Sequence, residues 1–215
     1  TDGGIRLNGE NLIGKKPYEI NRMGVARTFQ NIRLFPQQSV LDNVMTGLNN
    51  QVQYSLAESL LHVGSYHKKE KEMTERSMEI LRVFGLEDSA QTLASNLPYG
   101  KQRKLEIARA LATKPELLLL DEHTAALDPG TAEKVLNLTK RIVEEHQLTC
   151  LMITHNMQSA LDLGNRILMM DSGDVVLDIH EEEKKGLTVE GLLEKFKTGA
   201  GKMLDNDRIL LSGEK

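Results

Sequence analysis

The sequence has little cysteine, no long apolar run and no basic excess, and each absence excludes a class of protein. Cys150 is the one cysteine among 215 residues, which excludes a disulfide framework within the chain and is typical of a reducing compartment. Because Cys150 lies in an apolar run, we expect a buried thiol without a chemical role. Unbroken apolar stretches such as residues 117–120 are short, whereas a helix that spans a bilayer needs roughly 20 apolar residues.

Acidic residues outnumber basic residues by 31 to 27, and the formal net charge is −4. Non-specific binding to nucleic acid depends on lysines and arginines that neutralise phosphates, so we do not expect DNA or RNA to be a main partner. Hydrophobic residues make up 40% and charged residues 27% of the chain, which is the balance of an ordinary soluble globular protein. A chain of this length can bury one good core with a subdomain attached.

Hydrophobic patterning and turn residues predict strands at the two ends of the chain and helices between them. Strands are expected in short apolar or β-branched runs: a hairpin at 5–12, a strand within 24–36, buried strands at 116–122 and 150–155, and a second hairpin at 166–178. Helices are expected at 18–22, in a charged block from 39 to about 94, and at 101–112, 128–145 and 188–196. The alternation of strands and helices predicts an α/β fold with a parallel sheet.

Two of the predicted strands end in polar residues, Asp121-Glu122 and Thr154-His155. In an open α/β sheet, the carboxyl ends of the strands face the ligand crevice. A first carboxylate there can hold Mg²⁺ through water while a second polarises the attacking water, and a histidine nearby can donate to a γ-phosphate, which suits nucleotide hydrolysis. Polar residues also stand at strand ends simply because loops begin there, so each strand end taken alone leaves both interpretations open.

Five short motifs follow one another along the chain. A glutamine follows the strand-like VARTF, LPYGK occupies 97–101, LLLLDE occupies 117–122, AALD occupies 125–128, and a histidine follows downstream. In this order the chain resembles the nucleotide-binding subunit of an ABC transporter over nearly its whole length. The resemblance names the Q-loop glutamine Gln30, the signature motif with Leu97, Tyr99, Gly100 and Lys101, the Walker B strand with Asp121 and Glu122, the D-loop with Asp128, and the switch histidine His155.

The resemblance implies a fold and a domain division. We expect an α/β, P-loop NTPase-like ABC ATPase core that is incomplete at its N-terminus and carries an inserted α-helical subdomain. The N-terminal β part and Q-loop would occupy 1–36, and the helical subdomain with the signature motif 37–112. The rest of the ATPase core would occupy 113–180, and a charged tail with a short helix 181–215.

The resemblance also implies cofactors, roles and partners. ATP and Mg²⁺ are the expected cofactors: Glu122 would activate water, Asp121 and Gln30 would support Mg²⁺, and His155 would steady the γ-phosphate. The signature and D-loop residues would complete the nucleotide site. The expected partners are a second nucleotide-binding subunit paired head to tail, integral membrane permease subunits and, indirectly, a solute-binding protein. The protein would then be cytoplasmic and peripheral on the inner face of the cell membrane.

The stretch GENLIGKK, residues 9–16, imitates a phosphate-binding loop but does not complete one. It has the glycine and lysine spacing, yet Lys16 stands where a Ser or Thr hydroxyl would ligate Mg²⁺, and Pro17 follows where a helix should continue. In the family, the Walker A loop comes upstream of a segment that resembles residues 1–5. We therefore expect GENLIGKK to be a decoy with its turn at Asn8-Gly9. We also expect the Walker A loop and the adenine-stacking aromatic to be absent from this chain, which alone would bind ATP poorly.

Three residues depart from the family pattern. Pro98 stands where the signature motif usually has Ser, Lys101 where it usually has Gln, and His123 where a proline commonly follows the acid pair. Proline offers neither a hydroxyl nor an N–H to a γ-phosphate. Asp128 before Pro129 is also explained in full as a helix N-cap, alongside any D-loop role.

Other residues and other functions have plainer interpretations. The basic residues of the signature helix are expected to form a solvated face partnered by Glu106; they are Lys101, Arg103, Lys104 and Arg109. Residues 1 to about 122 resemble ATPases of branched-chain amino-acid importers, and the rest resembles importer ATPases linked to aromatic amino acids or related small solutes. The alternatives are a soluble ABC-type ATPase that acts on ribosomes or DNA, and a non-catalytic fragment that only associates with partners.

Overall fold

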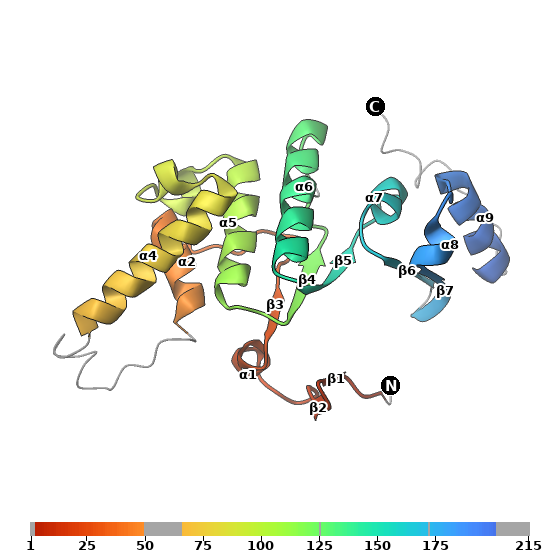
Figure 1. Ribbon diagram of the computed structural model, residues 1–215, viewed down its shortest axis with the longest axis horizontal. Helices are drawn as coiled ribbons and strands as arrows, with labels where there is room; N and C mark the ends of the chain where they lie inside the picture. Colours follow the sequence, from red (N-terminus) through yellow and green to blue (C-terminus); the bar gives the residue numbers. More distant parts are fainter. Residues whose placement is uncertain (1–2, 50–65, 125, 172, 201–215) are drawn as a thin grey trace. The chain divides into compact units, whose positions relative to one another are not determined.

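A computed structural model describes residues 3–49, 66–124, 126–171 and 173–200 (Figure 1). The chain forms two compact units, one that ends at Ile153 and one that begins at Thr154.

The first unit opens with a two-stranded hairpin of β1 (Arg6–Leu7) and β2 (Glu10–Asn11). Its turn falls on Asn8 and Gly9, whose φ angles of 48° and 85° are the left-handed values that a type I′ turn needs at both positions. The predicted hairpin and its turn are confirmed. The GENLIGKK stretch therefore runs from this turn through β2 to the start of α1 (Pro17–Arg22), a helix of 6 residues.

A parallel sheet forms the centre of the first unit. Its order is β3 (Val25–Arg27), β4 (Leu117–Asp121) and β5 (Thr149–Ile153), and both neighbouring pairs are parallel. The predicted parallel sheet is confirmed, because the buried apolar runs form its strands. The register places Asp121 opposite Ile153, so that β4 and β5 end level with each other.

The two faces of this sheet differ in burial. Leu118 and Leu120 are fully buried and share one hydrophobic core with Val135 of α6 (Pro129–Glu145). Alternate residues of β5 point the other way because side chains alternate along a strand, and there Leu151 and Ile153 are 48% and 47% exposed.

Helices fill the part of the first unit between β3 and β4. They are α2 (Val40–Leu48), α4 (Tyr66–Phe84) and α5 (Tyr99–Ala112), with the 3₁₀ turns η1 (Glu87–Ser89) and η2 (Ala94–Asn96) between α4 and α5. Helix α2 packs closely on α5, since a Cβ on Gly47 would lie 2.5 Å from the Arg109 carbonyl oxygen. The predicted helical block is confirmed over α2 and α4, and its part at 50–65 lies outside the described residues.

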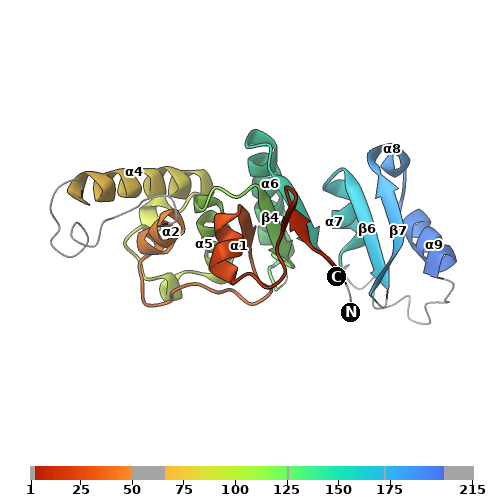
Figure 2. The ribbon, with the colours of Figure 1, turned by 90° about the horizontal axis from the view of Figure 1, so that it is seen from below.

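The second unit is built around an antiparallel hairpin of β6 (Arg166–Asp171) and β7 (Asp174–His180). Three helices accompany it: α7 (Met157–Asp162), α8 (Glu181–Lys184) and α9 (Val189–Ala200) (Figure 2). Ile167 and Ile179 of the hairpin and Leu192 of α9 are buried in its core. The predicted hairpin is confirmed, the predicted tail helix is longer than expected, and α7 was not predicted.

Candidate functional site

The acid pair at the end of β4 has an unusual backbone conformation. Asp121 is the last residue of the strand, and Glu122 follows it with a φ of 42°. Its N–H donates to the Ile153 carbonyl oxygen at 3.1 Å, so the strand pairing holds Glu122 in place. A left-handed conformation costs a residue with a Cβ roughly 1–2 kcal/mol. Such strain is typical of residues whose side chain has to be aimed at one point.

Gln30, which follows β3, lies against Glu122, which follows β4. The Gln30 side-chain amide donates to the Glu122 carboxylate, with Nε2 and Oε2 2.9 Å apart. Thr28 aligns the two segments: its N–H donates to the Leu119 carbonyl at 2.9 Å, and its hydroxyl accepts from the Asp121 N–H at 3.3 Å. Gln30 and Glu122 are thereby brought together from positions 92 residues apart.

Arg27 is a partner of Asp121 that we did not predict from the sequence. The Arg27 guanidinium lies 2.8 Å from the Asp121 carboxylate, and their side chains are 51% and 21% exposed. Arg27 also lies over the Phe29 ring, with 5.0 Å from the guanidinium carbon to the ring centroid. The sequence feature that could have identified this pair is the position of its members, because Arg27 and Asp121 end two strands that are neighbours in a parallel sheet.

The donor set at this edge fits Mg²⁺. Carboxylate and amide oxygens are hard ligands, and Mg²⁺ is usually held by one or two carboxylates together with substrate phosphates and water. Asp121, Glu122 and Gln30 supply such oxygens at the same edge. Among the described residues, no group of three or more His, Cys, Asp or Glu side chains gathers to hold a metal.

The signature residues surround the start of α5. Leu97 is buried, and Tyr99 begins the helix. Gly100 allows a close approach to α6, since a Cβ there would lie 2.6 Å from the Thr131 methyl group. Lys101 extends toward Ser89, whose hydroxyl oxygen lies 3.3 Å from its Nζ.

Two further predicted residues, Asp128 and His155, come after Glu122 in the chain. Asp128 caps α6, and its carboxylate accepts from the Thr131 N–H at 3.0 Å. Hydrogen bonds from the side chain and then from the backbone of Thr131 lower the pKa of Asp128, and the predicted N-cap is confirmed. His155 follows β5 by two positions, belongs to the second unit and is exposed. The role of each of these residues stays a prediction.

The basic face of α5 is not the solvated surface that we expected. Arg103 is fully buried, and its guanidinium lies 2.7 Å from the Glu106 carboxylate, which is itself 2% exposed. Lys104 and Arg109 are half-buried, and Lys101 is exposed. The prediction of a solvated face is therefore wrong for Arg103, while Glu106 is confirmed as its partner. Tertiary partners explain the difference, because both terminal nitrogens of the buried guanidinium are hydrogen-bonded, which offsets the cost of removing the charge from water, and only its Nε lacks a partner among the described residues.

Two further buried groups have shifted pKa values. His123 is 1% exposed, and burial, with the nearby Arg103 charge, lowers its pKa from 6.5 to about 4. Its imidazole is therefore neutral at physiological pH.

Cys150 is half-buried rather than fully buried, and desolvation raises its pKa to about 11. A thiol with this pKa stays protonated and is a poor nucleophile, in keeping with the expectation that Cys150 has no chemical role.

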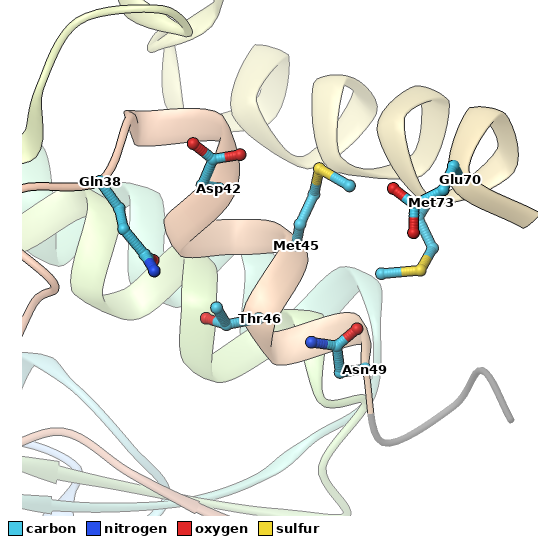
Figure 3. A pocket seen from close by; sticks show the side chains of 7 residues that line it. All are labelled: Gln38, Asp42, Met45, Thr46, Asn49, Glu70 and Met73. Atoms are coloured by element: carbon cyan, nitrogen blue, oxygen red, sulfur yellow. The ribbon is translucent and has the colours of Figure 1, made fainter. Parts of the chain in front are cut away.

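A pocket in the helical part of the first unit contains none of the predicted site residues. It measures about 280 Å³ and is lined from α2 and α4 and the residues beside α2; the lining residues are Gln38, Asp42, Met45, Thr46, Asn49, Glu70 and Met73 (Figure 3). The cluster of Asp121, Glu122 and Gln30 is therefore distinct from this pocket. No helix within the described ranges is long and apolar enough to cross a membrane.

Comparisons with known proteins agree on one family. The family described as ABC transporter matches residues 1–125. The high-affinity branched-chain amino acid transport ATP-binding protein LivG of Escherichia coli is 37% identical over 173 residues, covering 80% of this chain and 68% of LivG. A tyrosine transport ATP-binding protein of Clostridioides difficile is 35% identical over 198 residues, covering 91% of this chain and 75% of that protein.

Solved structures give the same result. The ADP conformation of MJ1267, an ATP-binding cassette of an ABC transporter, matches with a TM-score of 0.71 and 27% identity, over 92% of this chain and 77% of that one. The dimeric post-hydrolysis state of the ATP-binding cassette MJ0796, bound to ADP and Pi, matches with a TM-score of 0.68 and 28% identity, over 84% of this chain and 74% of that one.

Proposed function

The chain belongs to the ABC transporter family, and we propose that it is the ATP-hydrolysing subunit of an importer for amino acids. Its fold is that of an ABC ATPase cassette. The observation that carries the proposal is the contact between Gln30 and Glu122 at the carboxyl edge of the parallel sheet, 2.9 Å between the amide and the carboxylate. This edge is where α/β folds bind their ligands.

Glu122 is the proposed general base. Its conformation is fixed by the pairing of β4 with β5 and by the Gln30 amide, so its carboxylate needs little reorganisation to accept a proton from the attacking water. A general base of this kind contributes about 10²–10⁴-fold to a rate. His155 is proposed as a hydrogen-bond donor to the γ-phosphate, and the signature residues and Asp128 as parts of the nucleotide site.

Asp121 and Gln30 are the residues proposed to hold Mg²⁺. Bound Mg²⁺ neutralises phosphate charge that develops during phosphoryl transfer. The Asp121 carboxylate already accepts a hydrogen bond from Arg27, so Arg27 competes with the metal for this carboxylate. Because a half-exposed ion pair is worth little, this competition is weak.

The relatives support the proposed substrate and partners. One is named for branched-chain amino acid transport and another for tyrosine transport, which leaves amino acids as the proposed class of solute. The dimeric cassette MJ0796 supports a dimer. We extend this to a head-to-tail dimer with a second nucleotide-binding subunit, docked on membrane permease subunits at the inner face of the membrane. A solute-binding protein would act indirectly, and the division at 1–36, 37–112, 113–180 and 181–215 stays part of the proposal.

The test is ATP binding and hydrolysis by this chain and by a version that carries whatever residues precede Thr1 in its gene. In the version that binds ATP, Glu122→Gln is expected to retain binding and to lose turnover by about 100-fold or more. Glu116→Gln is the matched control, because Glu116 directly precedes β4 and so lies at the other end of the strand from Glu122. Turnover that survives Glu122→Gln, or that falls equally with Glu116→Gln, would overturn the assignment of the base.

A second experiment tests the transporter itself. The protein is expected to co-purify with hydrophobic membrane subunits. Association with ribosomes instead would favour a soluble ABC-type ATPase.

A further inference from the structure

The loop that follows β3 is held from its inner side by α5. We call residues 29–33 the post-β3 segment. The Arg103 guanidinium donates to the carbonyl oxygens of Phe29 and Gln30, each at 2.7 Å. A planar guanidinium can grip two acceptors at once because its N–H groups point outward in a fixed fork. One side chain of α5 therefore fixes two consecutive peptide groups of the segment.

Glu106 completes the contact from the next turn of α5. Its Oε1 accepts from the N–H groups of Phe29 and Arg33, at 3.5 and 3.2 Å, while Oε2 accepts from Arg103 at 2.7 Å. Arg109, three residues further on, donates to the Arg33 carbonyl. These three α5 side chains are three residues apart and therefore share one face of the helix.

The ion pair of Arg103 and Glu106 is buried where α5 meets the post-β3 segment. Arg103 and Glu106 are 0% and 2% exposed, and two charges removed from water are tolerated only where hydrogen bonds satisfy them. Here the two terminal nitrogens of Arg103 and the Glu106 carboxylate are hydrogen-bonded to the backbone of the post-β3 segment and to each other, while the Arg103 Nε has no partner among the described residues. Gln30 takes part in both contacts. Its carbonyl oxygen accepts from Arg103, and its side-chain Nε2 donates to the Glu122 Oε2 at 2.9 Å.

We propose that Arg103 and Glu106 are positioning residues that tie the post-β3 segment to α5 and so hold the Gln30 amide against the Glu122 carboxylate. The part that concerns hydrolysis rests on the proposed function. Helix α5 begins within the signature motif, and the Tyr99 hydroxyl lies 3.2 Å from the Arg103 guanidinium. The start of α5 and Gln30 are thus joined by a continuous set of contacts.

The first test is amide hydrogen exchange in the full chain with Arg103→Lys. The ammonium group retains the charge beside Glu106 but cannot grip two carbonyls. Exchange at the Phe29 and Arg33 amides is expected to become faster by about tenfold, because these amides open locally. Amides of β4 are expected to keep their rates. Arg76→Lys is the matched control, since Arg76 forms an ion pair with Glu72 on α4 at 2.7 Å, and it should change neither region.

The second test asks whether Arg103 acts through Gln30. In the ATP-hydrolysing version of the protein, Arg103→Lys is expected to lower kcat by about tenfold, since a small misplacement of a catalytic contact is costly. In a Gln30→Ala background the same change should have little further effect, because coupled residues are not additive. Equal effects in both backgrounds would mean that Arg103 does not act through Gln30.

The outcomes separate this proposal from the proposed function. Faster exchange in the post-β3 segment alone supports the tie to α5 whether or not the protein hydrolyses ATP. Unchanged exchange there, or an equal acceleration in β4, overturns it and leaves Arg103 as an ordinary core residue. If no version of the protein hydrolyses ATP, the proposed function fails while the exchange result still decides the tie.

Discussion

The post-β3 segment makes two contacts, with α5 on its inner side and with Glu122 on its outer side, and an ion pair lies at each. On the inner side, the Arg103–Glu106 ion pair is almost completely buried. On the outer side, where Gln30 contacts Glu122, the neighbouring residues Arg27 of β3 and Asp121 of β4 form an ion pair with nearly the same separation, 2.8 Å against 2.7 Å, but their side chains are 51% and 21% exposed. Breaking a buried ion pair costs several kcal/mol of free energy, about 3–5, whereas an exposed ion pair can exchange its partner for water or a ligand. The comparison indicates a rigid support on one side and a replaceable contact on the other, where chemistry is proposed.

The largest expected effect comes from removing one partner of the buried pair. Arg103→Met leaves the Glu106 carboxylate buried without its counter-charge, and we expect a loss of about 3–5 kcal/mol in the free energy of unfolding. Denaturation with urea measures it. Arg103→Met combined with Glu106→Gln should be less destabilised than Arg103→Met alone, because no isolated charge then remains and an amide oxygen can still accept from the Phe29 and Arg33 N–H groups. A double variant that is less stable than the single one would contradict the inner side as described.

A smaller effect is expected from pH, through His123 beside the buried pair. Its folded-state pKa of about 4 lies below the ordinary value of 6.5. The unfolded chain therefore binds a proton first as the pH falls, and stability is lost between pH 6.5 and about pH 4. From pH 7 to pH 5 this amounts to about 2 kcal/mol. His123→Asn should flatten this dependence, while His146→Asn, at an exposed position after α6, should not. An unchanged slope in His123→Asn would show that other groups cause the loss.

The smallest effect is expected on the outer side. Arg27→Gln removes a surface ion pair, and the free energy of unfolding should change by about 1 kcal/mol or less. Mg²⁺ affinity, measured by calorimetry with the nucleotide-bound protein, should stay equal or rise, because the Asp121 carboxylate loses a competing cation. A marked fall in Mg²⁺ affinity would mean that Arg27 supports the site instead of competing for it.

Part of the outer side could be predicted from the sequence. The apolar run before Asp121 predicts a buried strand, and a parallel sheet places the carboxyl ends of its strands at one edge, but Gln30 was identified only through the family resemblance and its contact with Glu122 was not predicted. The positive φ of Glu122 could not be predicted, because it depends on how the neighbouring strands pair.

The inner side could not be predicted, because helical charge patterns do not reveal tertiary partners. The four basic residues of α5 have the composition of a solvated face, and only the i, i+3 spacing of Arg103 and Glu106 indicated a pair. What buries Arg103 is the backbone of a loop more than 70 residues earlier in the chain. The short helix α7 was missed for a simpler reason: its 6 residues are too few to establish a helical period.

The central claim is that the two sides of the post-β3 segment are separate, with support on the inner side and hydrolysis on the outer side. The most direct test measures kcat and the free energy of unfolding of Gln30→Ala in the same ATP-hydrolysing protein. Its side chain is exposed and contacts Glu122, so we predict that kcat falls by about tenfold or more while the free energy of unfolding changes by about 0.5 kcal/mol or less. An unchanged kcat, or a loss of stability as large as that of Arg103→Met, would contradict the account.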